Sequence, residues 1–383
     1  MTFIYVRSLS QPEIHNLYYF KEKLDLYMAM DVTKLPLFPK EDPTSDRVVN
    51  QLLYEPPNYE IYSKNPSKQY KQISFYRERE RYWPDLFNYG TDNFLKCKVF
   101  TCNISKLTST ADLVIFTYDE PTAKSRNDQL HMFFTMESPL HAVRLNGPFD
   151  WISTYRRDSD IVADYGTWQY YDPNVRQLPQ TTNYAAGKRK KVAWFVTNCR
   201  APNNRLEIAL EMQKYIQVDI YGPCTDSKLS CSRSRENECF EMLEKEYKFY
   251  LAFENSNCRD YMTEKVYKNA LKHKVLPIVM GARPEDYRKY MPEHSFIHVD
   301  DFETVEDLAN YLNLLDRDDN LYNSYFQWRG TGEIIDKSYF WCRVCAMLHN
   351  PNMNREKFAL TGTSLKEYWR GDGICTQDNW KPK

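Results

Sequence analysis

Glu137 is the first residue whose place in the sequence suggests chemistry. It lies in Met136-Glu137-Ser138-Pro139, directly after the apolar run 132–134, so a carboxylate follows the end of a predicted strand. Such an acid either caps a helix or takes a proton from a substrate. From spacing alone the capping role is the commoner one. Glu137 becomes a candidate base only when other motifs of the sequence point to the same site.

A second group of reactive side chains occupies residues 254–265. An apolar run at 249–253 precedes them, helix-like spacing of apolar residues follows at 266–271, and a further apolar run lies at 275–280. This order predicts strand, loop, helix and strand, the parallel unit of an α/β sheet. Ligands bind beyond the carboxyl ends of such strands. The loop carries amides, hydroxyls, a carboxylate and an ammonium, which suit a phosphorylated, hydroxyl-rich ligand.

Residues 192–222 predict a similar unit of strand, loop, helix and strand. Its loop, 197–205, lacks the Gly-x-Gly-x-x-Gly pattern that cradles phosphates with backbone amides. Phosphates would therefore need side-chain cations, and Arg205 and Lys265 are the candidates.

Asp158-Ser159-Asp160 has the Asp-x-Asp form by which carboxylates hold a divalent metal in many sugar-nucleotide enzymes. Arg156 and Arg157 stand directly before it. Carboxylates beside arginines are usually ion pairs, so the sequence favours ion pairing over a metal site.

The rest of the chain supplies elements to position these groups. Residues 1–90 predict loops, short helices and at most one strand, and residues 172–190 have no apolar period, as in a linker. A capping-box-like start at Thr304 predicts a structural helix. Further strands are expected at 98–100, 113–116, 132–134 and 295–299.

Composition sets broader limits. The 383 residues suffice for two domains, and a formal net charge of -1 gives no reason to expect nucleic acid as a partner. No run approaches the roughly 18 apolar residues of a membrane span, and the opening apolar stretch is too short for a signal-peptide core. Membrane anchoring is thus not visible in this chain.

Ten cysteines are spread over most of the chain. Cys342 and Cys345 form a Cys-x-x-Cys, which is a redox pair, half a zinc site or two disulfide partners. Disulfides in an oxidising compartment are favoured, because no second close pair with zinc spacing is present. The sequon at Asn103 predicts a glycosylation site, which fits that compartment.

Several of these motifs together resemble the signature of the α1,3-fucosyltransferases, glycosyltransferase family GT10, in an invertebrate-like form. The loop 254–265 with Asn269-Ala270-Leu271 carries most of the likeness, which covers roughly residues 95–345. It also includes Met136 to Pro139, 155–160, 196–205, 247–251 and the Cys-x-x-Cys.

The resemblance implies an α/β fold of the GT-B class, with two Rossmann-like domains facing a central cleft. Expected boundaries are a polar, aromatic region of uncertain structure at 1–90, an acceptor domain at 91–172 that takes in part of 1–90, a linker at 173–190, a GDP-fucose-binding domain at 191–350 and a tail at 351–383.

The resemblance also implies roles. Glu137 is then the general base, Arg205 and Lys265 stabilise the leaving group, and Glu264 supports the transition state. Donor contacts are implied at Thr197, Asn198, Tyr250, Asn255 and Tyr261. GDP-fucose is the donor substrate and a GlcNAc-containing glycan the acceptor. No metal is obligatory, and a divalent metal is at most stimulatory.

By the same resemblance, Cys97 and Cys102 pair with Cys342 and Cys345, and Cys199 pairs with Cys239. Members of the family usually carry an N-terminal membrane anchor in the Golgi, so the resemblance implies the Golgi lumen. This chain shows no such anchor segment.

Three hypotheses follow. The first is an inverting fucosyltransferase that forms an α1,3 linkage to a GlcNAc hydroxyl of N-glycans or related glycans. The second is a non-catalytic glycan- or nucleotide-binding protein of the same fold. The third is a metal-dependent GT-A glycosyltransferase that uses Asp158 and Asp160.

Overall fold

The computed structural model describes residue 37 and residues 47–64, 70–77, 89–142, 147–226, 228–335, 339–350 and 362–380. The chain divides into two compact units. One comprises Met1–Leu113 with Trp341–Lys357, and the other Val114–Phe340 with Phe358–Lys383. Within the described ranges, no helix has the length and apolar character needed to cross a membrane.

The first unit contains short helices and a parallel strand pair. β1 (Lys71–Phe75) pairs with β2 (Cys102–Ser105), which places the buried side chains of Ile73 and Ile104 at the same level. Its helical segments are α2 (Arg47–Leu53), α3 (Tyr59–Lys64), η4 (Asp92–Phe94), η5 (Thr108–Thr110) and most of α9 (Phe340–Leu348).

The strand predicted at 98–100 is wrong. These residues form bends, and the strand begins only at Cys102. The backbone amides of Phe100 and Thr101 instead donate to the hydroxyl of Tyr59, at 2.8 and 3.2 Å. A side chain from α3 thus satisfies donors that a sheet would otherwise have paired.

Two disulfides attach α9 to this unit. Cys97 bonds to Cys342 and Cys102 bonds to Cys345, which confirms the pairing that the family resemblance implied. The bridges join residues that are 245 and 243 positions apart in the sequence. They therefore fix α9 covalently to a segment that lies far earlier in the chain.

The second unit begins with three strands that neighbour one another in chain order. They are β3 (Leu113–Phe116), β4 (Leu130–Thr135) and β5 (Trp151–Thr154). β4 and β5 are parallel and buried along their whole length, which explains the unbroken apolar character of their sequences. Glu137 follows β4 after one residue, as the sequence predicted.

The same unit holds a fully parallel sheet with the strand order β12-β11-β9-β7-β8. A sheet that runs in both directions from its first strand is doubly wound, the arrangement expected of a Rossmann-like domain. The strand predicted at 295–299 is reduced to two residues at the sheet edge. The strands are β7 (Lys190–Phe195), β8 (Val218–Tyr221), β9 (Tyr247–Phe253), β11 (Leu276–Met280) and β12 (Ile297–His298).

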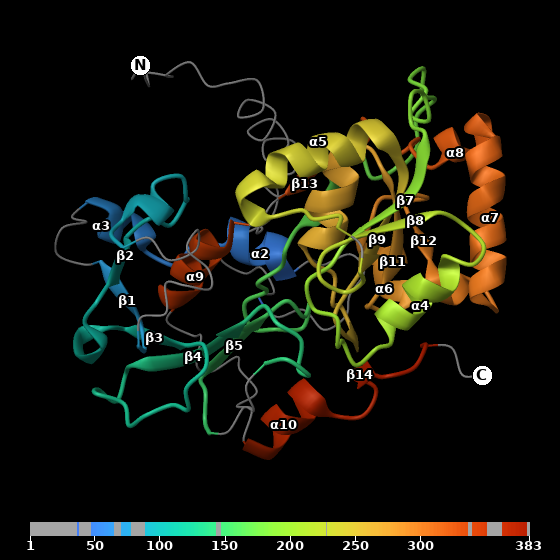
Figure 1. Cartoon of the computed structure of the whole chain (residues 1–383). Coiled ribbons are helices and arrows are strands. Elements are labelled where there is room, and N and C mark those ends of the chain that lie inside the picture. The colour runs from blue at the N-terminus through green and yellow to red at the C-terminus, as the bar shows by residue number, and fades with distance from the viewer. Residues whose placement is uncertain are drawn as a thin grey trace, which may run out of the picture. The chain divides into compact units, whose positions relative to one another are not determined.

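Alternate side chains of β9 divide the core into two halves, because successive strand residues point to opposite faces. Phe249, Leu251 and Phe253 pack with α4 (Arg205–Met212) and α7 (Val305–Arg317). Tyr250 and Ala252 pack with three helices on the other face, two of which are labelled in Figure 1. These are α5 (Glu236–Glu246), the π-helix η7 (Lys265–Ala270) and α6 (Pro284–Tyr290).

α7 begins as the sequence predicted. The Thr304 hydroxyl accepts a hydrogen bond from the backbone amide of Asp307 at 3.0 Å and donates to its carboxylate at 2.7 Å. The remaining helical segments of the unit are short. They are η6 (Arg233–Arg235), η8 (Leu271–His273), η9 (Val299–Asp301) and α8 (Asp319–Ser324).

Two short antiparallel pairs complete the second unit. β6 (Thr167–Tyr170) pairs with β13 (Gly332–Ile335), and β10 (Asn257–Cys258) pairs with β14 (Cys375–Thr376). The second pair joins the loop after β9 to the C-terminal segment, which also forms α10 (Gly362–Arg370) and buries Trp369. In Figure 1 this segment runs in red from α10 past β14.

The predicted pairing of Cys199 with Cys239 is wrong. Cys199 bonds to Cys224, since these residues follow the neighbouring strands β7 and β8. Cys239 lies on α5 and bonds to Cys231, eight residues before it. Cys258 and Cys375 form the fifth bridge, so all ten cysteines are paired.

Candidate active site

A buried carboxylate organises the loop that follows β9. Glu254 is 0 % exposed, and its Oε1 accepts hydrogen bonds from the backbone amide and the hydroxyl of Thr263, both at 2.8 Å. Its Oε2 lies 3.0 Å from the Lys265 ammonium. Burial raises the pKa of Glu254, and the charge of Lys265 counteracts part of that rise.

Lys265 binds three oxygens at the start of η7. Its Nζ lies 2.9 Å from Thr263 Oγ1, 3.0 Å from Glu254 Oε2 and 3.2 Å from Glu264 Oε1. Burial lowers the pKa of Lys265, but the two carboxylates raise it further, so the pKa lies above its usual value and the residue is a cation. The two carboxylates differ, because the Glu264 side chain is 46 % exposed.

Glu137 contacts two side chains of the same loop. Its Oε2 accepts a hydrogen bond from the Tyr261 hydroxyl at 3.3 Å and lies 3.5 Å from the Asn255 amide nitrogen. The Tyr261 ring is buried and packs on Tyr155 with 4.7 Å between ring centroids. The structure therefore brings together three predicted site residues that lie up to 124 positions apart in sequence.

Residues that the sequence did not single out support Glu137. Ser138 and Ser256 are joined through their hydroxyls at 2.7 Å, and Nδ1 of His141 lies 3.0 Å from Ser256 Oγ. Tyr165 donates to the Met136 carbonyl at 2.9 Å. Burial lowers the pKa of His141, against the opposing effect of Glu137. Hydroxyls and a tyrosine at these positions give no periodic signal in the sequence.

Arg205 bonds to the last carbonyl of β9 and to a carbonyl of the loop that follows β7. Its terminal nitrogens donate to Phe253 O at 2.8 Å and Asn198 O at 2.9 Å, and the side chain is almost fully buried. Burial lowers the pKa of Arg205, with Glu254 acting in the opposite direction. Thr197 and Asn198 lie exposed on the loop that Arg205 holds.

Tyr250 is a core residue of the strand that precedes the loop 254–265. It is fully buried in β9, where its hydroxyl accepts a hydrogen bond from the Asn269 amide at 3.2 Å and its ring packs on Phe195. Burial raises its pKa to about 12. Its predicted donor contact stays a prediction, and the contacts seen are those of a core residue.

Asp158 and Asp160 have separate protein partners. Asp158 forms a two-point ion pair with Arg156, and Asp160 accepts a hydrogen bond from the backbone amide of Ile152 at 2.6 Å. These contacts favour the ion-pair interpretation of the motif. Among the described residues, one group of possible metal ligands lies close enough together to hold an ion, namely Cys102, Cys345 and His349. Its two sulfurs are joined in a disulfide.

Asn103, the predicted glycosylation residue, lies in β2. Its amide nitrogen donates to the Gln72 side chain at 2.8 Å, and Ile104 inside the sequon is buried. A glycan on Asn103 would take the place of that hydrogen bond. Glycosylation at this residue stays a prediction.

Two protein-family models match the chain. One, described as Fucosyltransferase, N-terminal, matches residues 65–166. The other, described as Glycosyltransferase family 10 (fucosyltransferase) C-term, matches residues 185–362. The second match includes the loop 254–265, and the first includes Glu137.

Curated relatives span most of the chain. Glycoprotein 3-alpha-L-fucosyltransferase A of Drosophila melanogaster is 50% identical over 356 residues, covering 90% of this chain and 69% of that protein. Alpha-(1,3)-fucosyltransferase C of the same organism is 36% identical over 309 residues, covering 72% and 71%. The human 4-galactosyl-N-acetylglucosaminide 3-alpha-L-fucosyltransferase FUT6 is 36% identical over 263 residues, covering 64% and 70%.

Solved structures share the fold. A crystal structure of alpha1,3-fucosyltransferase with GDP-fucose superimposes with a TM-score of 0.53 at 18% identity, covering 82% of this chain and 98% of that one. The structure with GDP gives the same score and covers 82% and 99%. The likeness confirms the predicted GT-B fold class, and with it the GT-A hypothesis is wrong.

Proposed function

Since the chain belongs to glycosyltransferase family 10, the fucosyltransferases, we propose that it is an inverting enzyme that transfers fucose from GDP-fucose. The acceptor is a GlcNAc hydroxyl of an N-glycan or related glycan, and the product is an α1,3 linkage. The relatives named above, whose names state 3-alpha-fucosyl transfer, support this assignment.

The observation that carries the proposal is the meeting of Glu137 with the loop 254–265. An inverting transfer from a nucleotide sugar needs a base on one face of the sugar ring and charge stabilisation of the diphosphate on the other. Asn255 and Tyr261 of this loop contact Glu137, and Lys265 is the last residue of the loop. Both functions are thus attached to one segment.

In the proposed reaction the GlcNAc hydroxyl attacks C1 of fucose while the bond to the diphosphate breaks. Glu137 takes the hydroxyl proton, which is typically worth about 10² to 10⁴ in rate. The electron pair of the broken bond goes to the GDP β-phosphate. Lys265 stabilises that charge, and the exposed Glu264 is the partner that moves to admit the donor and then supports the oxocarbenium-like ring.

We assign Arg205 to the same leaving group, with a second role in holding the loop that carries Thr197 and Asn198. Thr197, Asn198, Tyr250, Asn255 and Tyr261 are the proposed donor contacts. The boundaries at 172 and 190 are proposed to separate the acceptor domain from the donor domain. We propose no obligatory metal, and residence in the Golgi lumen.

The test is a mass-spectrometric acceptor screen. The protein is incubated with GDP-fucose and a panel of GlcNAc-terminated, core and galactosylated N-glycans, with and without a chelator. Products heavier by one deoxyhexose support the proposal, and linkage analysis of the product then identifies the modified GlcNAc. No product on any acceptor, with GDP still bound, would instead favour the non-catalytic binding protein.

Glu137→Gln separates enzyme from binder more sharply. The amide keeps the hydrogen-bonding positions facing Tyr261 but cannot take a proton. We expect transfer to fall by about 10² to 10⁴ while GDP affinity stays unchanged. Glu285→Gln, at an exposed carboxylate on α6, is the matched control and should retain full activity.

A further inference from the structure

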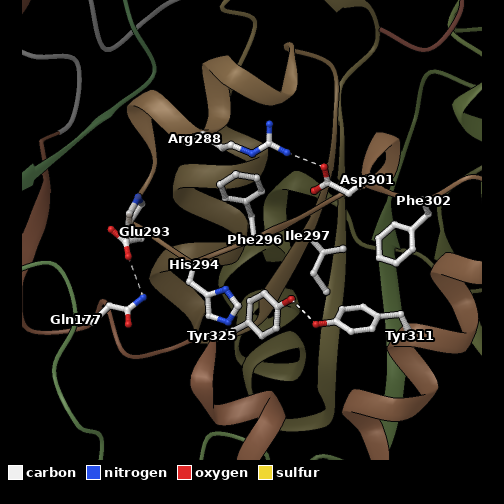
Figure 2. A pocket seen from close by; sticks show the side chains of 11 residues that line it. Gln177, Arg288, Glu293, His294, Phe296, Ile297, Asp301, Phe302, Tyr311 and Tyr325 are labelled. Carbon is white, nitrogen blue, oxygen red and sulfur yellow. Dashed lines mark hydrogen bonds and ion pairs between the residues drawn. The ribbon is translucent and has the colours of Figure 1, made fainter. Parts of the chain in front are cut away.

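A pocket of about 600 Å³ opens beside β12, the edge strand of the parallel sheet. Its volume lies inside the range of about 300 to 1,000 Å³ that is typical of small-molecule sites. Figure 2 shows it from close by, with aromatic rings across the middle and charged groups at two sides. It shares no lining residue with the cluster around Glu137 and Lys265.

Phe and Tyr rings form one part of the wall. Phe302 and Tyr311 lie with 5.5 Å between ring centroids, and the hydroxyl of Tyr311 is joined to that of Tyr325 at 2.7 Å. Phe296 lines the side nearest Arg288 in Figure 2. Flat apolar rings next to hydroxyls suit a ligand that has an apolar face and polar edges.

The polar rim consists of paired charges. Arg288 donates to Asp301 at 2.7 Å, and Glu293 accepts from the Gln177 amide at 3.4 Å and lies 3.8 Å from Arg176. Because each cation faces a carboxylate, the rim offers no surplus positive charge for a phosphate. Carboxylate and amide oxygens are acceptors that suit a ligand rich in hydroxyl donors.

His294 supplies a strained feature at the same rim. Its φ of +54° is a left-handed conformation that is uncommon for a residue with a side chain. Its ring stacks on Tyr325 at 3.9 Å, and its Nε2 lies 3.2 Å from the Ser324 hydroxyl. Residues held in such conformations cluster at ligand sites.

We propose that this pocket is a second saccharide-binding site, which takes a neutral, hydroxyl-bearing sugar ring with its apolar face on Phe302 and Tyr311 and its hydroxyls toward Glu293 and Asp301. The pocket's chemistry carries this inference without reference to Glu137. The choice of a GlcNAc oligosaccharide as its occupant rests on the proposed function.

Photo-crosslinking with mapping by mass spectrometry tests the proposal. The full chain is irradiated with a diazirine derivative of N,N′-diacetylchitobiose, without donor, in the presence and absence of excess GDP. We expect crosslinks on peptides that contain residues 293–302 or 311–325, lost on adding excess unlabelled disaccharide and unaffected by GDP. Crosslinks confined to peptides with Glu137 or 255–265, or none at all, would overturn the inference.

Variants locate the binding within the pocket. Phe302→Ala should lower the crosslink yield at sub-saturating probe by about threefold to tenfold, the value of one aromatic contact. Glu293→Gln should lower it by a similar factor, because a charge-assisted hydrogen bond becomes a neutral one. Leu314→Ala, at an exposed residue on the same helix as Tyr311, and Glu285→Gln are the controls and should keep the full yield.

The same variants keep the two proposals apart. Neither Phe302 nor Glu293 is placed in the transfer reaction, so both variants should retain fucose transfer to a monosaccharide acceptor. Retained crosslinking in both would overturn the second saccharide site and leave the transferase intact. Failure of the wild type to transfer fucose, with the crosslinks present, would sink the proposed function and leave the saccharide site standing.

Discussion

At the scale of single residues, the positive charge of Lys265 faces two demands, one structural and one proposed for catalysis. It neutralises the buried carboxylate of Glu254, and it is the proposed cation for the leaving diphosphate. Removing one partner of a buried ion pair costs about 3 to 5 kcal/mol, because the other is left uncompensated in a low-dielectric setting. Loss of activity in a Lys265 variant therefore has a structural and a chemical cause.

Lys265→Ala should lower the free energy of unfolding by about 3 to 5 kcal/mol, measured by denaturant titration. Adding Glu254→Gln should restore most of this stability, since no buried charge remains, yet should not restore transfer. Lys268 lies on the same helix as Lys265 and forms an exposed ion pair with Glu236 of α5. Lys268→Ala should cost about 1 kcal/mol or less. A Lys265 variant no less stable than the Lys268 variant would contradict the buried-pair account.

Asp260 is a second buried acid in the same loop. Its backbone amide donates to Asp286 at 2.9 Å, and its carboxylate accepts from the Arg157 amide at 3.2 Å and lies 3.8 Å from Arg259. Burial and the neighbouring Asp286 carboxylate raise its pKa to about 6. Its φ of +61° suits Asn as well as Asp.

The sign of the resulting pH dependence follows from proton binding. Between about pH 4 and 6 the folded state binds the Asp260 proton more tightly than the unfolded state, so this residue's contribution to stability falls as pH rises. Asp260→Asn should remove that loss, on the order of 3 kcal/mol between pH 4 and 7. Unfolding titrations across this pH range test it, and parallel wild-type and variant curves would refute it.

The sequence predicts which residues meet at the site better than it predicts the contacts that hold them. It assigns Glu137, Asn255 and Tyr261 to the site. It does not assign Glu254, because a glutamate at a strand end carries no sign of burial, and its partners Thr263 and Lys265 are fixed by a loop conformation that lacks a repeat. It identifies Arg205 as a cation and gives no sign of the backbone hydrogen bonds that Arg205 makes.

At the scale of elements, the C-terminal segment acts as a strap over the loop 254–265. Besides the β10 and β14 pair and the Cys258–Cys375 bridge, Arg259 donates its amide to Ile374 O at 2.8 Å. Trp380 donates from its indole to Gly281 O at 3.0 Å. Of the residues held in this way, Asn257, Cys258 and Arg259 lie between Asn255 and Tyr261, whose side chains contact the Glu137 carboxylate.

Replacing Cys258 and Cys375 by Ser should therefore impair catalysis as well as stability. We expect kcat/KM to fall by about tenfold to a hundredfold, the cost of misplacing reacting groups by about an ångström. The matched control replaces Cys231 and Cys239, which are eight positions apart and join α5 to the segment just before it. Equal activity in the two double variants, measured well below their melting temperatures, would argue against the strap.

Long periodic elements were predictable and short paired ones were not. The strands at 113–116 and 249–253 and the helix that starts after Thr304 have apolar patterns that their burial explains. β10 and β14 have two residues each, too few for any period, and their pairing depends on partners 117 positions apart. The strand expected at 98–100 is absent, and the backbone amide of Phe100 donates to the Tyr59 hydroxyl instead of to a neighbouring strand.

At the scale of the whole molecule, the two bridges to α9 act on the unfolded chain jointly. Either one alone closes a loop of more than 240 residues, worth about 5 kcal/mol in the chain-entropy model. Once one has formed, the other closes only a loop of about eight residues, worth about 2 to 3 kcal/mol.

Removing one bridge, as Cys97→Ser with Cys342→Ser, should thus cost about 2 to 3 kcal/mol, whereas removing both should cost about 8 kcal/mol. The loss of stability on removing both bridges thus exceeds the sum of the two single losses, because the two bridges close the same large loop. A double-mutant cycle on unfolding free energies measures this excess. Additive losses would show that native-state contacts of the bridges dominate over chain entropy.

These bridges also change what a protease does to the molecule. A single cut anywhere between residues 103 and 341 separates two peptides that Cys97–Cys342 and Cys102–Cys345 still hold together. The exposed stretch 171–179 is a ready target for such a cut. A nicked molecule would run as one intact band on a non-reducing gel and as two fragments after reduction. The disulfides would therefore keep the molecule in one piece after its backbone has been cut.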